Sequence, residues 1–119
     1  MQTKTDVYSF PKRCVLNHAA DFRDLFQLGK KIKTPYFALL IKPTQHDYPR
    51  LGLVVAKKAI RRAVHRNQIK RIIRESFRHH QQILCGYDTL VMVYHSANTL
   101  SKQVLRETLD KQWKKLITL

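Results

Sequence analysis

Five basic side chains recur at every fourth position in the middle of the chain: Arg62, Arg66, Lys70, Arg74 and Arg78. On a helix this spacing places like charges next to one another, and solvated helices normally interleave acids because such charges repel. The repulsion becomes tolerable if phosphate groups lie against the row. Most of the five are arginines, whose planar guanidinium suits bidentate contact with phosphate oxygens. The spacing therefore predicts a surface that binds a nucleic-acid backbone.

A helical wheel at about 100° per residue divides residues 61–80 into two sides. Asn67 and Arg71 share the sector of the five cations, and Asn67 adds a donor and acceptor able to reach a base edge or a 2′-hydroxyl. Glu75 is at the edge of that sector. The other side is expected to dock on a sheet, and it consists of Ile69, Ile72, Ile73, Ser76 and Phe77.

The acids and histidines do not form a catalytic arrangement. Asp21 and Asp24 are close in sequence, but both fall early in an expected helix, where the helix dipole favours acids without any metal. His65, His79 and His80 lack the spacing of a zinc-protease motif. We therefore expect no catalytic residue and no bound metal or other cofactor in the protein itself.

Composition favours one domain with a polyanionic partner. The 119 residues suit a single core, with polar residues 1–7 expected to be flexible. A net charge of +15 favours nucleic acid over an anionic membrane, and no run approaches the roughly 18 apolar residues of a spanning helix. No signal peptide is recognisable. Cys14 and Cys85 are far apart in the sequence and do not suggest a disulfide framework. A cytoplasmic protein with reduced thiols is expected.

The elements that position these groups follow from apolar spacing and helix caps. A first helix is expected from an Asn17 cap to Gly29, with Phe22, Leu25 and Phe26 on one face.

Three strands are expected at residues 36–41, 51–56 and 89–94, and Gly86 is expected to end the segment before the last of them. Segment 51–56 is apolar on both sides of its alternation, which favours a central strand. Ser101 is expected to cap a final helix that buries Leu105, Leu109, Trp113 and Leu116. The order predicts an α+β sandwich around one sheet.

Residues 51–58 (LGLVVAKK) and 63–78 (AVHRNQIKRIIRESFR) resemble the signature of the bacterial ribonuclease P protein subunit. Phe10-Pro11, the first helix, Tyr87-Asp88 and the C-terminal helix follow in the family's order, so nearly the whole chain is covered. Two departures stand out. Gln68 replaces a common second arginine, and Tyr94-His95 follows the last strand where a basic residue is common.

The resemblance implies a four-stranded sheet with a left-handed βαβ crossover, similar to the second domain of ribosomal protein S5. It also implies a subunit that binds a catalytic RNA, in one copy per RNA, and assists endonucleolytic removal of the 5′ leader from precursor tRNA. In that scheme the RNA holds the catalytic Mg²⁺, the arginine-rich helix contacts the RNA, and a cleft between the first helix and the sheet receives the leader.

Proteins bind single-stranded RNA by stacking its bases on aromatic side chains that are surrounded by basic residues. The residues expected to bind the leader in the cleft are therefore Phe22, Phe26, Tyr36, Lys57 and Lys58. Tyr36 and Phe37 point to opposite faces of a strand, and at most one of them is expected to line the cleft.

Two other classes remain open on composition. A structural ribosomal-type RNA-binding protein would have a similar charge, although it would not require this order of residues 57–78. A DNA-binding regulator would place a turn and a short helix before its recognition helix. Here a strand leads into the basic helix, which argues against that class.

Overall fold

The computed structural model describes residues 14–16 and 18–118. Its elements, in chain order, are α2 (Ala19–Leu28), β1 (Lys30–Lys33), β2 (Phe37–Pro43), β3 (Arg50–Val54), α3 (Ala63–His79), α4 (Gln81–Leu84), β4 (Tyr87–Val93), the 3₁₀ helix η2 (His95–Thr99) and α5 (Lys102–Ile117). Residues 1–7, expected to be flexible, and the expected cap Asn17 lie outside the described residues.

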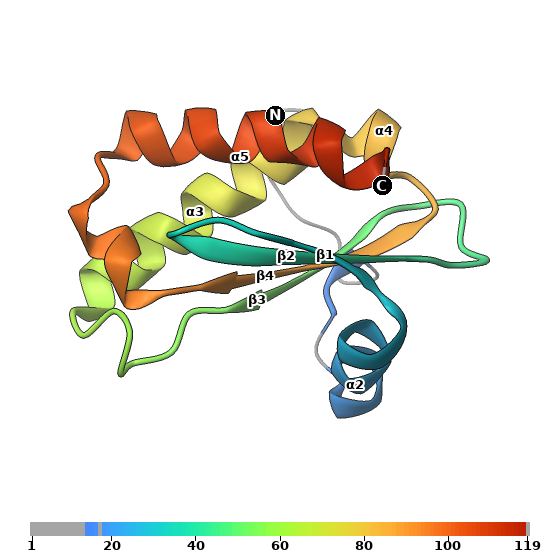
Figure 1. Ribbon diagram of the computed structural model, residues 1–119, viewed down its shortest axis with the longest axis horizontal. Coiled ribbons are helices and arrows are strands. Elements are labelled where there is room, and N and C mark those ends of the chain that lie inside the picture. Colours follow the sequence, from blue (N-terminus) through green and yellow to red (C-terminus); the bar gives the residue numbers. More distant parts are fainter. Residues whose placement is uncertain (1–13, 17, 119) are drawn as a thin grey trace, which may run out of the picture.

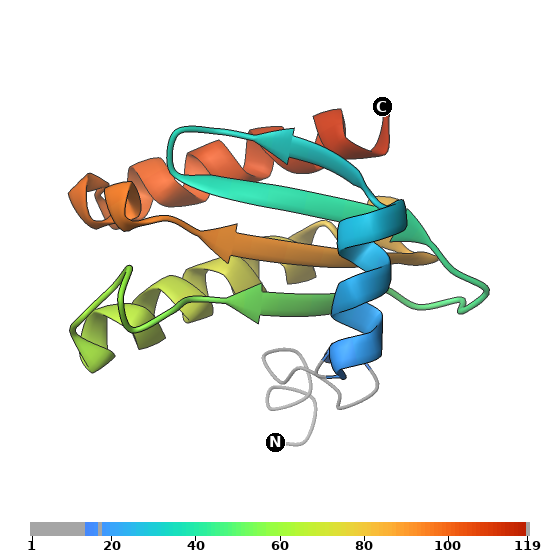
Figure 2. The same cartoon turned by 60° about the horizontal axis from the view of Figure 1, so that its bottom comes forward.

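The four strands form one sheet in the order β1-β2-β4-β3. β1 and β4 pair antiparallel with β2, whereas β3 and β4 are parallel and joined through α3. Figure 1 shows α3, α4 and α5 on one face of the sheet and α2 on the other. With α3 behind the sheet in Figure 2, the crossover from β3 to β4 is left-handed. The α+β fold class is confirmed.

The prediction that segment 51–56 forms a central strand is wrong, because β3 is at the edge of the sheet. It is nevertheless apolar on both faces because helices cover one face and Phe22 lies on the other: a Cβ placed on Gly52 would be 2.8 Å from Cε1 of Phe22. Its open edge is partly covered by the chain before α2, where the Leu16 amide donates to the Leu51 carbonyl at 2.9 Å. β3 is therefore buried on both faces by the elements packed against it, not by a central position in the sheet.

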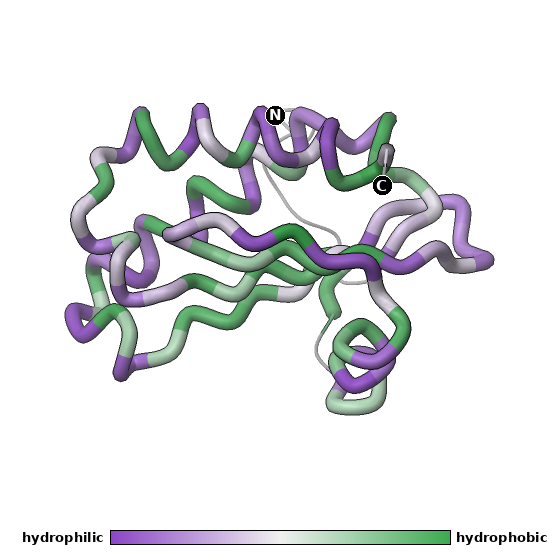
Figure 3. The backbone as a smooth tube through the Cα atoms, in the orientation of Figure 1, coloured by the Kyte–Doolittle hydropathy of each residue, from purple (hydrophilic) through white to green (hydrophobic). Residues whose placement is uncertain are grey.

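The sheet separates two apolar clusters. The larger one, on the side of α3 and α5, contains Phe37, Leu39 and Ile41 of β2, and the smaller one, beside α2, contains Ala38 and Leu40. Because successive side chains of β2 point to opposite faces of the sheet, this strand contributes to both clusters. Figure 3 shows hydrophobic segments gathered in the strands and hydrophilic ones at the turns.

Local signals at the helix ends are partly confirmed. The Ser101 hydroxyl caps α5 by accepting from the Val104 amide at 3.2 Å. Gly29 ends α2 with an extended backbone, and a Cβ there would lie 2.5 Å from the Leu25 carbonyl oxygen. The N-cap of α2 is His18, whose side chain makes no capping hydrogen bond. Gly86, at φ 84°, turns the chain into β4, a conformation that favours glycine.

Candidate nucleic-acid interface

Helix α3 has two distinct sides. Ile69, Ile73, Ser76 and Phe77 are buried, as predicted from the wheel, and Ile72 is partly buried. Phe77 packs edge-on against Trp113 of α5, with ring centroids 5.8 Å apart and planes at 77°. The Trp113 Nε1 group donates to the buried Ser76 hydroxyl at 2.7 Å, which explains a serine on this side of the helix. Packing on the sheet and on α5 therefore fixes which side of α3 faces outward.

The outward side carries the predicted cations. Arg62, Asn67, Arg71 and Arg74 are exposed, whereas Arg66, Lys70 and Arg78 are partly buried. Lys70 and Arg74 line a cavity of about 150 Å³ beside Leu51 and Leu53 of β3. Of the seven predicted residues, the structure thus brings Lys70 and Arg74 together beside β3, whereas Arg62, the residue before α3, lines a separate cavity with Val64, His65 and Gln68.

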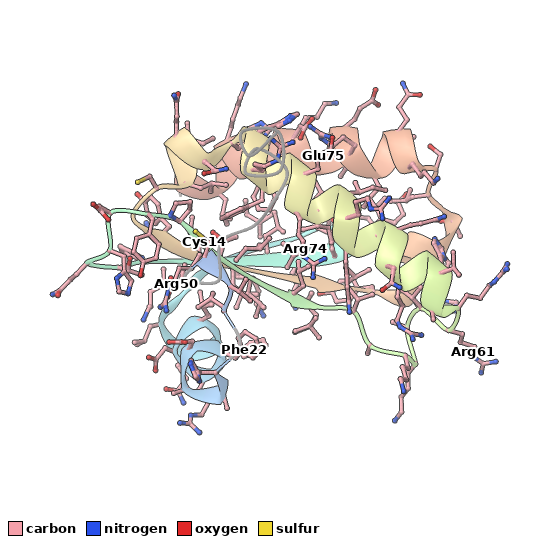
Figure 4. The ribbon with its side chains drawn as sticks, turned by 180° about the vertical axis from the view of Figure 1, so that it is seen from behind. Cys14, Phe22, Arg50, Arg61, Arg74 and Glu75 are labelled. Atoms are coloured by element: carbon pink, nitrogen blue, oxygen red, sulfur yellow. The ribbon has the colours of Figure 1, made fainter. Side chains whose placement is uncertain are left out.

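The acid at the border of this side does not neutralise it. Glu75 Oε1 lies 3.6 Å from Arg106 Nη1 of α5. In Figure 4, Glu75 points toward α5 and Arg74 points away from it, toward β3. Among the ion pairs of the described residues, none involves Arg62, Lys70, Arg71 or Arg74. Within the described part of the chain, these four cations are therefore not neutralised by an acidic side chain.

Arg66 has a structural function that the wheel did not reveal. Its Nη1 donates to the Ile60 carbonyl at 3.0 Å and to the Arg61 carbonyl at 2.9 Å. These bonds close the turn that carries Lys57 and Lys58 into α3. Arg66 therefore offers fewer donors to a phosphate than its exposed neighbours do.

Gln68 is partly buried and lines a small cavity with Ile72, Leu100 and Leu105, facing η2 and α5. It also lines a cavity with Arg62, at the N-terminal end of α3. The departure from the family pattern at this position leaves the five cations of the row in place.

The other face of the sheet, here called the α2 face, carries the partly buried side chains Phe22, Val54, Met92 and Tyr94 packed on the smaller cluster. Figure 2 shows α2 crossing one end of the strands and leaving the rest of this face without a helix over it. Phe26, one turn after Phe22, is 48% exposed. Tyr94 is not among the residues predicted for the leader site. Its aromatic ring on this face could have been inferred from alternation along β4.

Two other predicted residues of the leader site, Lys57 and Lys58, are exposed in the turn after β3. In Figure 1 this turn protrudes on the same side of the sheet as α2 but at the opposite end of the strands. The lysines therefore flank the α2 face at a distance from Phe22 and do not surround it.

The prediction that Tyr36 lies in the same site as Phe22 is wrong. Tyr36 packs against the larger cluster, on the α5 side of the sheet. Its carbonyl accepts from the Tyr94 amide at 2.9 Å, so the backbone continues the pairing of β2 with β4 before β2 begins. Phe37 is also in the larger cluster, and neither aromatic residue reaches the α2 face.

An ionic group that sequence reasoning missed attaches α2 to the sheet. Arg50 donates through Nε and Nη2 to the two carboxylate oxygens of Asp88, at 2.7 and 2.6 Å. Arg50 Nη2 also lies 3.6 Å from Asp21 of α2. Figure 4 shows Arg50 between α2 and the sheet. The hydrogen bond to Asp88 raises the pKa of the Arg50 guanidinium, against the opposing effect of burial. An acid at the start of an apolar strand was the available signal, because a buried carboxylate requires a partner.

These contacts also account for the acids and histidines considered as catalytic groups. Asp21 faces Arg50, and Asp24 lies 3.8 Å from Lys42. His79 Nδ1 contacts Arg106 at 2.8 Å, and His80 Nδ1 contacts the Ser76 carbonyl at 2.7 Å. Within residues 14–16 and 18–118, no group of three or more His, Cys, Asp or Glu side chains is arranged to hold a metal ion, and no helix is long and apolar enough to cross a membrane.

Known proteins resemble this chain over most of its length. The family model described as Ribonuclease P matches residues 10–117. The ribonuclease P protein component of Marinomonas sp. is 40% identical over 110 residues, covering 92% of this chain and 83% of the relative. That of Acinetobacter baylyi is 42% identical over 111 residues, covering 92% and 85%.

Solved structures show the same fold. The RNase P protein of Staphylococcus aureus superposes with a TM-score of 0.79 at 27% identity, covering 87% of this chain and 97% of that one. The RNase P protein of Thermotoga maritima gives a TM-score of 0.71 at 30% identity, covering 87% and 96%. With its left-handed crossover and the cationic side of α3, the chain belongs to the ribonuclease P protein family.

Proposed function

We propose that the protein binds the catalytic RNA of ribonuclease P through the cationic side of α3 and the 5′ leader of precursor tRNA across the α2 face. In this way it assists Mg²⁺-dependent endonucleolytic removal of the leader, as one copy per RNA in the cytoplasm. The observation that carries the proposal is the group of cations Arg62, Lys70, Arg71 and Arg74, which make no ion pair among the described residues, while the bordering acid Glu75 is paired with Arg106.

Binding of a folded RNA by α3 is supported by charge and shape. A helix held rigidly by its apolar side presents its cations at fixed spacing, so phosphates can bind without first ordering the protein. If Arg62, Lys70, Arg71 and Arg74 each neutralise one phosphate, log K should fall against log salt with a slope of about −3 from this surface alone. Asn67, exposed among them, can add a contact to a 2′-hydroxyl.

Binding of the leader by the α2 face is supported by its partly exposed aromatic side chains. Phe22 and Tyr94 can each stack with a base, a contact usually worth about 1–3 kcal/mol and tolerant of base identity. Lys57 and Lys58 extend from the same side of the sheet and can neutralise the phosphates of a strand that crosses it. Such a surface suits leaders of varied sequence.

In this proposal the RNA subunit, not the protein, cleaves the phosphodiester bond. Metal-dependent phosphodiester cleavage needs carboxylates free to bind metal, whereas Asp21, Asp24, Asp88 and Asp110 each lie within ion-pair distance of an arginine or lysine. Mg²⁺ held by the RNA would supply the activated water and stabilise the leaving oxygen. The protein contributes binding energy and position.

Reconstitution tests the proposal. The purified protein alone should leave precursor tRNA uncleaved, yet restore cleavage at low Mg²⁺ when mixed with the cognate RNA. The gain should be larger for a substrate with a leader of several nucleotides than for one with almost none. A protein that leaves the RNA's activity unchanged for both substrates would instead support a purely structural RNA-binding role.

A further inference from the structure

A groove of about 600 Å³ lies on the opposite side of the sheet from α2, between the turn that joins β1 to β2 and the second half of α5. Ile32, Pro35 and Tyr36 form an apolar part of its wall, and Lys33 and Lys115 contribute from the two sides. Figure 2 shows β1 as the edge strand, with α5 behind it. Neither of the surfaces assigned above includes this groove.

The turn that forms one wall is held in place by several hydrogen bonds. The Thr34 hydroxyl accepts from the Tyr36 and Phe37 amides at 3.1 and 3.0 Å. The Ser96 hydroxyl of η2 donates to the Pro35 carbonyl at 2.5 Å. Tyr36 is therefore presented by a fixed backbone, and a flat ligand can bind against it with little ordering of the protein.

The residue types around the groove fit one nucleotide. Its volume is within the range of about 300–1,000 Å³ that is usual for ligand sites. Tyr36 and Pro35 supply flat apolar contacts for a base, and Lys33 and Lys115 supply charge for a phosphate. Gln112 of α5 supplies a donor and an acceptor, and the Thr108 hydroxyl, which donates to the Val104 carbonyl, can accept.

The positive charge here is not balanced by ion pairs. Among the ion pairs of the described part of the chain, none involves Lys31, Lys33, Lys111 or Lys115. The Asp110 carboxylate on α5 instead accepts from Arg106 at 3.2 Å.

Lysines on an edge strand have a simpler explanation, since they discourage pairing with another sheet. That explanation applies to β1 but not to Lys115 on α5, nor to an aromatic groove between the two elements. Charge complementarity therefore favours a polyanion over an apolar partner.

The position of β1 indicates which polyanion binds in the groove. β1 follows α2 directly and forms the edge around which a strand can pass from the α2 face to the groove. Lys31 and Lys33 on this edge provide phosphate contacts along that path. The cationic side of α3 is beside β3, at the other edge of the sheet. A leader on the α2 face thus lies nearer to the groove than the RNA bound by α3.

We propose that the groove lined by Tyr36, Lys33 and Lys115 binds a nucleotide of the leader on the 5′ side of the segment that crosses the α2 face. This inference rests on the proposed function. It predicts that long leaders gain affinity in two steps, first from the α2 face and then from the groove.

The test measures equilibrium binding of the reconstituted holoenzyme to precursor tRNAs whose leaders are lengthened one nucleotide at a time. Tyr36→Leu should weaken binding of long leaders by roughly fivefold, near the lower end of base–aromatic stacking, and leave short leaders unaffected. Lys115→Gln should flatten the salt dependence for long leaders by about 0.7 in slope, as loss of one single-strand phosphate contact requires. The matched control is Lys102→Gln, an exposed lysine at the other end of α5 that should change neither quantity.

The outcomes separate the inference from the proposed function. If affinity rises with short leaders but both groove variants bind every long leader as tightly as the unaltered protein, the inference is overturned and the proposed function stands. If leader length has no effect at all, the proposed function fails. Equal weakening at every length, including the substrate without a leader, would place another part of the RNA in the groove and also overturn the inference. Lys115→Gln keeps the test valid if Tyr36→Leu perturbs folding.

Discussion

Removing the Arg50 side chain should both destabilise the protein and release α2 from the sheet. In Arg50→Met the apolar stem is largely kept, while Asp88, whose side chain is 2% exposed, loses two hydrogen bonds of 2.7 and 2.6 Å. Removing one partner of a buried ion pair costs about 3–5 kcal/mol, because the remaining charge is left unpaired. The Arg50 side chain is 18% exposed, and water can partly replace it, so the lower end of that range, about 3 kcal/mol, applies.

Urea unfolding measures this cost. With an m value of about 1.5 kcal/mol/M, a loss of about 3 kcal/mol lowers the midpoint by about 2 M. The contribution of Asp21 is smaller, since its oxygen is 3.6 Å from Arg50 and its side chain is 24% exposed.

The pH dependence follows from the raised pKa of Arg50. A group whose folded pKa is raised stabilises fully below its unfolded pKa and loses that contribution as pH rises through the folded pKa. An ordinary arginine already loses its proton only in strongly alkaline solution. The difference between the protein and Arg50→Met should therefore persist through neutral and mildly alkaline solution and decrease only at strongly alkaline pH.

A second substitution distinguishes the ion pair from simple loss of packing. In Arg50→Met/Asp88→Leu both charges are replaced by apolar groups, a change that is often nearly neutral for a buried pair. The double variant should recover most of the stability lost in the single one. The reasoning is refuted if Arg50→Met shifts the urea midpoint by less than about 0.5 M, or if the double variant is no more stable than the single one.

Three further substitutions test individual contacts. Arg74→Gln should flatten the salt dependence of binding to the RNA subunit by about 0.7–0.9 in slope, whereas Lys102→Gln, at an exposed lysine of α5, should leave the slope unchanged; equal slopes for Arg74→Gln and the unaltered protein would exclude a phosphate contact there. Trp113→Phe should lower the free energy of unfolding by about 1–3 kcal/mol, because the buried Ser76 hydroxyl loses its 2.7 Å donor, and urea titration should detect it. Ser101→Ala should cost about 1 kcal/mol by removing the cap on α5, a loss that Ser101→Asn should largely avoid in the same titration.

The position of Tyr36 illustrates why a site can be assigned to the wrong face. Alternation correctly places neighbouring strand residues on opposite faces. Tyr36, however, precedes β2: its carbonyl still accepts from the Tyr94 amide, but its backbone belongs to a turn held by Thr34 and Ser96, and its side chain does not follow the alternation of β2. Its side of the sheet is decided by hydrogen bonds to the turn, and it consequently contributes to a different groove.

Features that depend on local spacing could be predicted from the sequence. The two sides of α3, the cap at Ser101 and the end of α2 at Gly29 follow from helical periodicity and terminal chemistry within a few residues. The group of cations on α3 could be predicted for the same reason, since they lie on one helix or directly before it.

Features that depend on distant partners are set by tertiary packing. β1, with the sequence Lys-Lys-Ile-Lys, has no apolar alternation of its own and is a strand because it pairs with β2. β3 is buried on both faces at the edge of the sheet, because the elements that cover it are distant in sequence. Arg50 and Asp88 are 38 residues apart, and Glu75 meets Arg106 on another helix. Pairings of this kind are selected by packing of the whole chain, so they determine how α2 is held and why Glu75 does not pair with the cations beside it on α3.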